Sequence, residues 1–309
     1  MSVKIFSGRA TTYLAEKIAH AYGEPLGKVD YQQFSDGEMS PFISESVRGH
    51  DVFIVQSTFA PAENFMEMLL MIDAARRASA ENVNVIIPYF GYARQDRKDK
   101  PRVAIAAKLI ANLISAAGAD RIMTCDLHAD QIQGFFDIPV DHLDGNYIFV
   151  PYLKSLNLAN IMFASPDVGG IKRARSFAKF FNADLAVCDK YRKEANKTES
   201  MRLIGEVEGK DVILVDDLVD TGGTICKAAG LLKEKGANSV RAVCTHPVLS
   251  GKAYENIENS ALEEMVVADT IPLRQPCKKI KVLSVSDLFA KAIRKIHDHE
   301  SISSLFIRL

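Results

Sequence analysis

Residues 212–224 read VILVDDLVDTGGT, and this stretch determines the expected fold class. Its first four residues form a short, continuous apolar run, which is typical of a parallel strand buried on both faces. Two carboxylates follow, and the Thr-Gly-Gly-Thr after them opens a helical pattern over 224–235. A strand, a turn and a helix in this order begin a βαβ unit, so the stretch predicts an α/β protein with a mainly parallel sheet.

The rest of the chain repeats this alternation of short β-branched runs and longer helical patterns. The sequence predicts strands at 4–7, 51–56, 83–88, 121–125, 160–165, 185–188, 212–215 and 240–245, and helices at 65–78, 104–117, 170–181 and 224–235.

A weak internal repeat indicates two similar domains. Asp51-Val-Phe-Ile-Val and Asp211-Val-Ile-Leu-Val each open a strand, a turn and a helix, and 309 residues suffice for two cores. Only the second copy has an acidic, glycine-bearing turn, because the first continues as Gln56-Ser-Thr-Phe-Ala-Pro-Ala. Gly145, Asn146 and Pro151 cluster between the copies, so we expect domains at 1–147 and 148–309.

Composition limits the partners and the compartment. Thirty-eight Lys and Arg balance 39 Asp and Glu, so no global field favours nucleic acid or an anionic membrane. Five cysteines without close pairs fit a reducing compartment. The N-terminus lacks the basic flank and long apolar core of a signal peptide, and Lys108 and Asn112 interrupt the most apolar helix pattern. We therefore expect a cytoplasmic protein that binds neither nucleic acid nor membrane.

The acidic turn is the first candidate site. Asp216 and Asp217 fall at the predicted carboxyl end of a parallel strand, where ligands of such sheets bind. The helix that follows offers unpaired N–H groups to a phosphate, and its glycines permit close approach. The alternative is a capped helix after a polar turn. That alternative leaves unexplained the three mutually repelling carboxylates within five residues, the third being Asp220.

The run DDLVDTGGT resembles the phosphoribosyl diphosphate loop of type I phosphoribosyltransferases and of ribose-phosphate diphosphokinases (PRPP synthetases). The resemblance implies that Asp216 and Asp217 contact the ribose hydroxyls. It also implies that the 5-phosphate is held by Asp220, Thr221, Gly222, Gly223 and Thr224.

Two N-terminal segments resemble the ATP-binding parts of PRPP synthetases in particular. Residues 34–38, FSDGE, resemble the segment that a neighbouring subunit lends to the adenine nucleotide, which assigns Asp36, Gly37 and Glu38 to ATP, although Asp-Gly also signals a plain hairpin turn. Residues 88–102, PYFGYARQDRKDKPR, place five cations after three aromatics and resemble the nucleotide-binding loop. ATP contacts at Arg94, Gln95 and Lys98 are implied, the alternative being a solvated charged loop.

Further motifs resemble the metal and catalytic segments of the same family. His128, in Asp-Leu-His, and Asp167, before a glycine turn and a basic helix with Lys172, Arg173 and Arg175, are implied to contact Mg²⁺. A histidine that is merely hydrogen-bonded is the alternative for His128. Lys190 and Arg192 match the catalytic lysine and arginine of a loop that closes over phosphates, and Arg192 is also implied to contact ribose 5-phosphate. The alternative is an ordinary surface loop.

The resemblance extends from Lys4 to Phe306 and implies two phosphoribosyltransferase-like domains, each a mainly parallel sheet flanked by helices. The implied activity transfers the diphosphoryl group of ATP to the 1-hydroxyl of ribose 5-phosphate with Mg²⁺, giving PRPP and AMP. A phosphoribosyltransferase and a non-catalytic regulatory homologue remain alternatives. The resemblance also implies a homo-oligomer, commonly a hexamer, and a regulatory site for phosphate and ADP at Ser46, Arg48, Ser303, Ser304 and Phe306.

Overall fold

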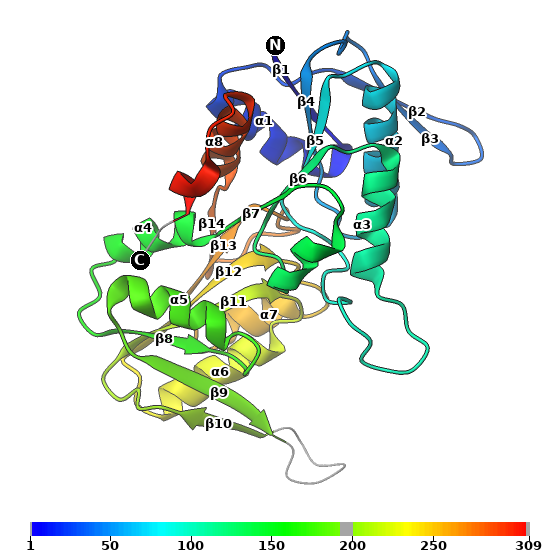
Figure 1. Cartoon of the computed structure of the whole chain (residues 1–309). Coiled ribbons are helices and arrows are strands. Elements are labelled where there is room, and N and C mark those ends of the chain that lie inside the picture. The colour runs from blue at the N-terminus through cyan, green and yellow to red at the C-terminus, as the bar shows by residue number, and fades with distance from the viewer. Residues whose placement is uncertain (1, 192–199, 307–309) are drawn as a thin grey trace. The chain divides into compact units, whose positions relative to one another are not determined.

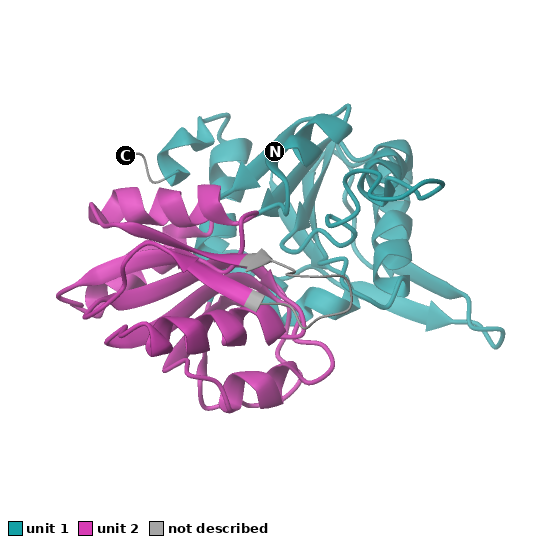
Figure 2. Ribbon diagram, turned by 90° about the horizontal axis from the view of Figure 1, so that it is seen from below, with its two compact units in different colours: residues 1–144, 284–306 teal, residues 145–283, 307–309 magenta. Residues whose placement is uncertain are grey.

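The computed structural model describes residues 2–191 and 200–306, which divide into two compact units (Figures 1 and 2). Unit 1 holds the chain up to Asp144 together with Ser284–Phe306, and unit 2 holds Gly145–Leu283. The first division falls close to the expected boundary after residue 147. The C-terminal segment, which the sequence assigned to the second domain, lies in unit 1.

Helix α8 (Ser286–His297) explains why the C-terminal segment belongs to unit 1. It packs against α1 (Thr12–Tyr22), with the Arg294 guanidinium 4.6 Å from the centre of the Tyr22 ring and donating to the Tyr22 carbonyl. At the end of α8, His297 Nδ1 lies 2.8 Å from Asp51 Oδ2. These partners are far apart in sequence, so hydropathy patterns alone do not reveal them.

The sheet of unit 1 has five strands in the order β1-β4-β5-β6-β7, and every neighbouring pair is parallel. The strands are β1 (Val3–Ser7), β4 (Asp51–Val55), β5 (Asn82–Ile87), β6 (Arg121–Cys125) and β7 (Val140–Leu143). A separate antiparallel hairpin is formed by β2 (Val29–Gln33) and β3 (Met39–Ile43). Three short 3₁₀ segments complete the unit: η1 (Arg9–Thr11), η2 (Asp130–Phe135) and η3 (Ile302–Leu305).

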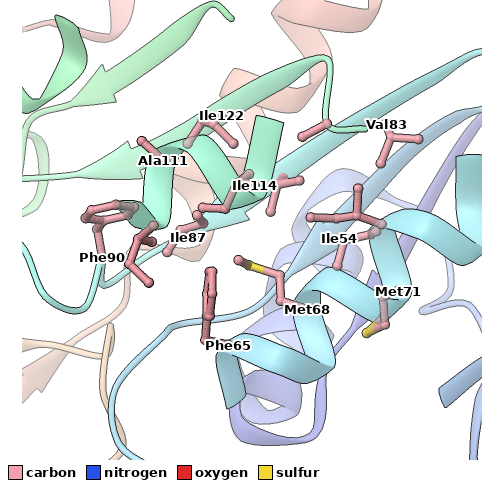
Figure 3. Close-up of a cluster of buried hydrophobic side chains, with 14 of the residues drawn as sticks. Ile54, Phe65, Met68, Met71, Val83, Ile87, Phe90, Ala111, Ile114 and Ile122 are labelled. Carbon is pink, nitrogen blue, oxygen red and sulfur yellow. The ribbon is translucent and has the colours of Figure 1, made fainter. Parts of the chain in front are cut away.

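The core of unit 1 lies between this sheet and two helices, α2 (Glu63–Arg77) and α3 (Ala106–Ala117) (Figure 3). Met68 and Met71 of α2 and Ile114 of α3 are almost fully buried against strand residues such as Ile54 and Ile87. The spacing of three and four residues between the buried helix positions is the periodicity that predicted these helices.

Unit 2 contains a seven-stranded sheet in the order β10-β9-β8-β11-β12-β13-β14, in which only the β9–β10 pair is antiparallel. The strands are β8 (Ile161–Ser165), β9 (Leu185–Tyr191), β10 (Ser200–Ile204), β11 (Asp211–Val219), β12 (Ser239–Pro247), β13 (Glu264–Ala268) and β14 (Ile280–Leu283). The helices are α4 (Asn146–Ser155), α5 (Ile171–Phe181), α6 (Gly223–Glu234) and α7 (Ala253–Glu258). The predicted α/β class, with two mainly parallel sheets flanked by helices, is confirmed.

The strand order of unit 2 creates a switch point between β8 and β11. From β8 the chain passes through α5 to β9 on one side, and from β11 it passes through α6 to β12 on the other. Ligands of open α/β sheets bind beyond the carboxyl ends of strands at such a point. Among the described residues, no helix is both long enough and apolar enough to cross a membrane.

Candidate active site

The acidic pair of unit 2 lies inside a strand, which corrects the prediction that the strand ends at Val215. Strand β11 continues to Val219 because the long β12 keeps pairing with it, as far as Val219 opposite Pro247. On its other side, pairing with β8 stops at Leu214. Asp216 and Asp217 therefore remain on an extended backbone, but they lie past the paired end of β8, at the switch point.

Carboxylates crowd this point. Burial, followed by the nearby charges of Asp217 and Asp167, raises the pKa of Asp216 to about 8. The Arg173 guanidinium on α5 acts in the opposite direction, and its Nη2 lies 3.7 Å from Asp217 Oδ1. Among the described residues, three carboxylates beside the Arg173 guanidinium leave excess negative charge, which suits sugar hydroxyls as donors or a bound cation.

The turn into α6 is built for close approach of a ligand. Gly222 is the N-cap of α6, adopts φ = 73°, and has no side chain with which to cap the helix. Ordinary side-chain capping, the alternative for this turn, therefore does not occur at the N-cap position. Gly223 and Thr224 begin α6, and Thr221 is exposed just before it. Helix-start amides next to glycine offer donors to a phosphate.

Two side chains from the segment after β12 support this turn, and sequence analysis missed both. Ser250 donates from Oγ to Asp220 Oδ1, and its backbone N–H donates to the Asp220 carbonyl over 2.9 Å. Asn256 of α7 donates from Nδ2 to the Thr221 carbonyl over 2.9 Å. The predicted phosphate turn is thus fixed from outside by ordinary polar residues that carry no motif.

Asp167 follows β8 and starts the turn into α5. Its Oδ1 accepts a hydrogen bond from the Gly170 N–H over 3.0 Å, and Ser165 Oγ donates to its carbonyl over 2.5 Å. The side chain therefore supports a helix start, and its charge also reaches Asp216. Its place at the end of β8 agrees with the predicted place at the carboxyl edge of the sheet.

The cationic loop 88–102 follows β5 in unit 1. Arg94, Gln95 and Lys98 are exposed on it. The loop is ordered by its backbone, since Gln95 N–H donates to the Tyr92 carbonyl over 2.9 Å and the Gln95 carbonyl accepts from Ala107 N–H over 3.2 Å. The candidate ATP contacts thus lie on a turn that is tied to the start of α3.

His128 is exposed in the turn after β6, and a second histidine supports that turn. The Leu127 N–H donates to His142 Nε2 over 2.8 Å, which makes that ring nitrogen an acceptor. His142 Nδ1 lies 3.2 Å from Gln133 Nε2. Sequence analysis missed His142 because it lies on β7, beyond the Asp-Leu-His motif.

The hairpin prediction for residues 34–38 is confirmed, while their contact with a nucleotide stays a prediction. Gly37 takes φ = 98° at the tip, and the Glu38 N–H donates to Asp36 Oδ1 over 3.1 Å. All three tip residues, Asp36, Gly37 and Glu38, are exposed.

The candidate catalytic residues lie at the border of the described chain. Lys190 is near the end of β9, where its backbone pairs with Met201 of β10. Beside it, Arg202 Nε donates to Asp189 Oδ2 over 2.9 Å and joins the two strands. The side chain of Lys190 and the whole of Arg192 lie outside the described residues.

The five candidate regulatory residues all belong to unit 1. Ser46 and Arg48 are exposed between β3 and β4. Ser303 and Ser304 lie in η3 after α8, and Phe306 follows it. Within residues 2–191 and 200–306, no three or more His, Cys, Asp or Glu side chains gather closely enough to hold a metal ion by themselves.

Comparison with known proteins gives one consistent result. The family model for the N-terminal domain of ribose phosphate pyrophosphokinase matches residues 3–118, and that for the phosphoribosyl synthetase-associated domain matches 192–307. A ribose-phosphate pyrophosphokinase of Wolinella succinogenes is 58% identical over 98% of this chain and 99% of its own length, and one of Porphyromonas gingivalis is 55% identical over 98% and 97%. The crystal structure of phosphoribosylpyrophosphate synthetase from Mycobacterium smegmatis matches with a TM-score of 0.91 and 38% identity, over 97% of this chain and 100% of that chain.

Proposed function

We propose, because this chain belongs to the ribose-phosphate pyrophosphokinase family, that unit 2 binds ribose 5-phosphate at the β11–α6 turn and that unit 1 binds ATP with loop 88–102. The family reaction moves the diphosphoryl group of ATP to the 1-hydroxyl of ribose 5-phosphate and leaves AMP. The phosphoribosyltransferase alternative is disfavoured, because the relatives that match this chain over nearly its whole length are pyrophosphokinases.

The observation that carries the sugar-phosphate assignment is the position of three carboxylates beside an uncapped glycine turn at the β8–β11 switch point. In this proposal Asp217 and the ionised form of Asp216 accept hydrogen bonds from the ribose hydroxyls, since ionised carboxylates are acceptors only. The amides of residues 220–224 donate to the 5-phosphate at the start of α6. Ser250 and Asn256 hold that turn before the ligand arrives.

The residues of unit 2 fit Mg²⁺ as the implied metal. Burial raises the pKa of Asp216 most, and repulsion from Asp217 and Asp167 raises it further. Carboxylate oxygens are the ligands that Mg²⁺ prefers. Mg²⁺ commonly uses one or two protein carboxylates together with substrate phosphates, and when bound it offsets the charge of the transferring group. From the family pattern we also propose Asp167 and, separately, His128 as contacts of Mg²⁺.

The remaining roles are proposed from the family pattern and the local structure. Arg94, Gln95 and Lys98 bind ATP, and an exposed, backbone-ordered loop supports this role. Lys190 and Arg192 meet the negative charge that develops during transfer. Diphosphoryl transfer by such a site depends on positioning and electrostatic stabilisation, so these cations contribute more than any single proton transfer.

Assembly and control are also proposed. The exposed tip with Asp36 and Glu38 completes the ATP site of a neighbouring copy. The active protein is therefore a homo-oligomer, and we propose a hexamer. Phosphate and ADP act through Ser46, Arg48, Ser303, Ser304 and Phe306. If inorganic phosphate leaves the rate unchanged and Arg48→Ala behaves as wild type, this regulatory assignment is wrong.

An assay of AMP formed from ATP and ribose 5-phosphate with Mg²⁺ tests the function, and Lys190→Ala tests the catalytic role. We expect AMP from the wild type and a loss of at least about 100-fold in kcat for the variant, the loss typical of removing a charge-stabilising donor. Full activity of Lys190→Ala would overturn the catalytic assignment. Absence of AMP, with intact nucleotide binding, would favour the non-catalytic regulatory homologue.

A further inference from the structure

The turn after β4 in unit 1 is the counterpart of the sugar-phosphate turn in unit 2. Both follow a strand that begins with Asp-Val, but the turn in unit 1 has Gln56, Ser57 and Thr58 where unit 2 has an acidic sequence. These three polar side chains are among the most buried in the unit, with exposures of 0%, 0% and 3%. Buried polar groups are normally hydrogen-bonded, so their partners indicate what the turn does.

Part of this turn is filled by its own protein partners. The Ser57 N–H donates to Thr11 Oγ1 over 2.7 Å, and Gln56 Nε2 donates to the Asn64 carbonyl over 3.1 Å. A Cβ on Gly8 would come within 2.4 Å of the Gln56 side chain, so little space remains there. This turn is closed where its counterpart is open, and it is not a second sugar-phosphate site.

The other side of the turn is bonded to the root of the cationic loop 88–102. The Gly91 N–H donates to Thr58 Oγ1 over 2.7 Å, and the Tyr89 N–H donates to Ser57 Oγ over 3.1 Å. The Thr58 N–H and hydroxyl both donate to the Tyr89 carbonyl, over 3.0 Å and 3.3 Å. The Thr58 hydroxyl is therefore an acceptor and a donor at once, and a methyl group in its place loses both bonds.

Gly91 permits this contact. A Cβ at position 91 would lie 2.1 Å from the Thr58 carbonyl oxygen, so a larger residue would push the loop away. The anchored backbone continues directly into the turn closed by the hydrogen bond from Gln95 N–H to the Tyr92 carbonyl. Arg94 lies within that turn, so an anchor at Gly91 fixes the direction in which the candidate ATP contacts leave the sheet.

We propose that Thr58 is a positioning residue for ATP, which holds the root of loop 88–102 through Gly91 and so keeps Arg94 and Gln95 in place before the nucleotide binds. The proposal rests on the proposed role of this loop. In this view the turn after β4 supports the binding of ATP, whereas its counterpart in unit 2 binds ribose 5-phosphate. Preorganised contacts bind more tightly because less loop ordering opposes binding.

Thr58→Val and Thr58→Ser test the proposal. Valine keeps the shape and removes the hydroxyl, whereas serine keeps the hydroxyl. We expect Thr58→Val to raise the Kd for ATP, measured by titration calorimetry with Mg²⁺, at least about fivefold, since a buried N–H loses its acceptor. The KM for ribose 5-phosphate should stay within about twofold, as expected if the loss is confined to the loop, and Thr58→Ser should bind ATP like the wild type.

Thr124→Val is the matched control. Thr124 lies on β6 of the same sheet, is 1% exposed, and its hydroxyl has no hydrogen-bond partner among the described residues. We expect its ATP affinity to be unchanged. If Thr58→Val does not fold, Ser57→Ala, which removes the acceptor of the Tyr89 N–H, is measured in its place and should show the same selective loss.

The outcomes separate the inference from the function on which it rests. Arg94→Ala is measured beside the other variants. If Arg94→Ala weakens ATP binding and Thr58→Val does not, the positioning role of Thr58 is overturned and the ATP site stands. If Arg94→Ala leaves ATP binding unchanged, the proposed ATP site itself fails. If Thr58→Val raises both the Kd for ATP and the KM for ribose 5-phosphate, and Thr58→Ser does not restore them, Thr58 has a general structural role and the proposal is overturned.

Discussion

Arg173 on α5 faces Asp217 on β11, with 3.7 Å between Nη2 and Oδ1. This pair places a cation beside a group of carboxylates that repel one another, and it lowers the pKa of Asp216, which burial and the neighbouring charges raise. Arg173 was visible in the sequence only as one cation of a basic helix. Its position makes it a regulator of the charge at the candidate sugar site.

Replacing Arg173 tests that role. In Arg173→Ala the pKa of Asp216 rises further, because the guanidinium charge that lowers it is removed. More of the acid is then protonated at neutral pH and cannot accept two hydroxyl bonds, so the Kd for ribose 5-phosphate should rise, and should recover toward the wild-type value at higher pH. Arg173→Lys should restore part of the affinity. A Kd for Arg173→Ala that does not depend on pH between 6 and 9, about the range of the raised pKa, would contradict this explanation.

Asp216→Asn should separate stability from function. An unfolded Asp has a pKa of about 3.9, whereas burial and the neighbouring carboxylates raise the pKa of folded Asp216 to about 8. The stability gained from this proton is present below the lower value and is lost as pH rises through the higher one. Asparagine does not ionise. We therefore expect ligand-free Asp216→Asn to have the same Tm as the wild type near the unfolded pKa of about 3.9 and a higher Tm above the folded pKa of about 8. A difference of about 1 kcal/mol in the free energy of unfolding corresponds to roughly 2–4 °C in Tm.

The same variant should bind ribose 5-phosphate more weakly, because an amide replaces an acceptor-only carboxylate. Thermal unfolding at several pH values, with and without the sugar phosphate, measures both effects. A Tm difference that is the same at low and high pH would show that the titration of Asp216 does not cause it.

Gly222→Ala should weaken ribose 5-phosphate binding selectively. Gly222 has φ = 73°, and a Cβ there would lie 3.4 Å from the Ala253 carbonyl oxygen. That contact is an ordinary one, but an L side chain is strained at this φ, which costs on the order of 1–2 kcal/mol for the backbone alone. We expect a KM for ribose 5-phosphate at least about fivefold higher, with the KM for ATP unchanged. Gly209→Ala is the control, since Gly209 has φ = 68° but nothing within 4 Å of an added Cβ.

The support of the Asp-Leu-His turn by His142 can be tested with a pair of substitutions. His142→Phe removes the acceptor of the Leu127 N–H, and leaving that donor unsatisfied costs about 1–3 kcal/mol. We expect this variant to lose kcat and Mg²⁺-dependent ATP affinity through displacement of His128. His142→Gln offers an oxygen acceptor and should recover most of both. Equal loss in the two variants, with unchanged unfolding temperatures, would rule out the hydrogen bond as the cause.

The sequence predicted most inner strands of both sheets, because each is a short apolar run between breakers, but it missed β13 (Glu264–Ala268), which is also largely buried. Residues 121–125 form β6 as expected. It did not predict strand β14, whose residues are partly or fully exposed, nor the hairpin strand β2, whose residues are mostly polar. The predicted end of β11 at Val215 was wrong, because the length of a strand depends on the strand that pairs with it. For β11 that strand is β12, which lies in another part of the sequence.

In the candidate site, too, residues with a local sequence pattern were predicted and residues defined by distant partners were not. Carboxylates, glycines and clustered cations carry recognisable patterns, so Asp216, Gly222 and Arg94 could be found from the sequence. Thr58, Ser250 and His142 act through hydrogen bonds to groups of other segments of the chain. These residues belong to no recognisable sequence motif, and only the folded structure shows which donor or acceptor each of them contacts.

Helix α8 has a consequence for how the protein is made. On the ribosome, all of unit 2 emerges before residues 284–306, which carry the helix that covers α1. Domains generally fold as units during synthesis, often the N-terminal one first. Here the α1 surface of the nascent unit 1 stays uncovered until residues 284–306 have emerged as well. Synthesis of unit 1 therefore starts before that of unit 2, but unit 1 can complete its fold only after all of unit 2 has been made.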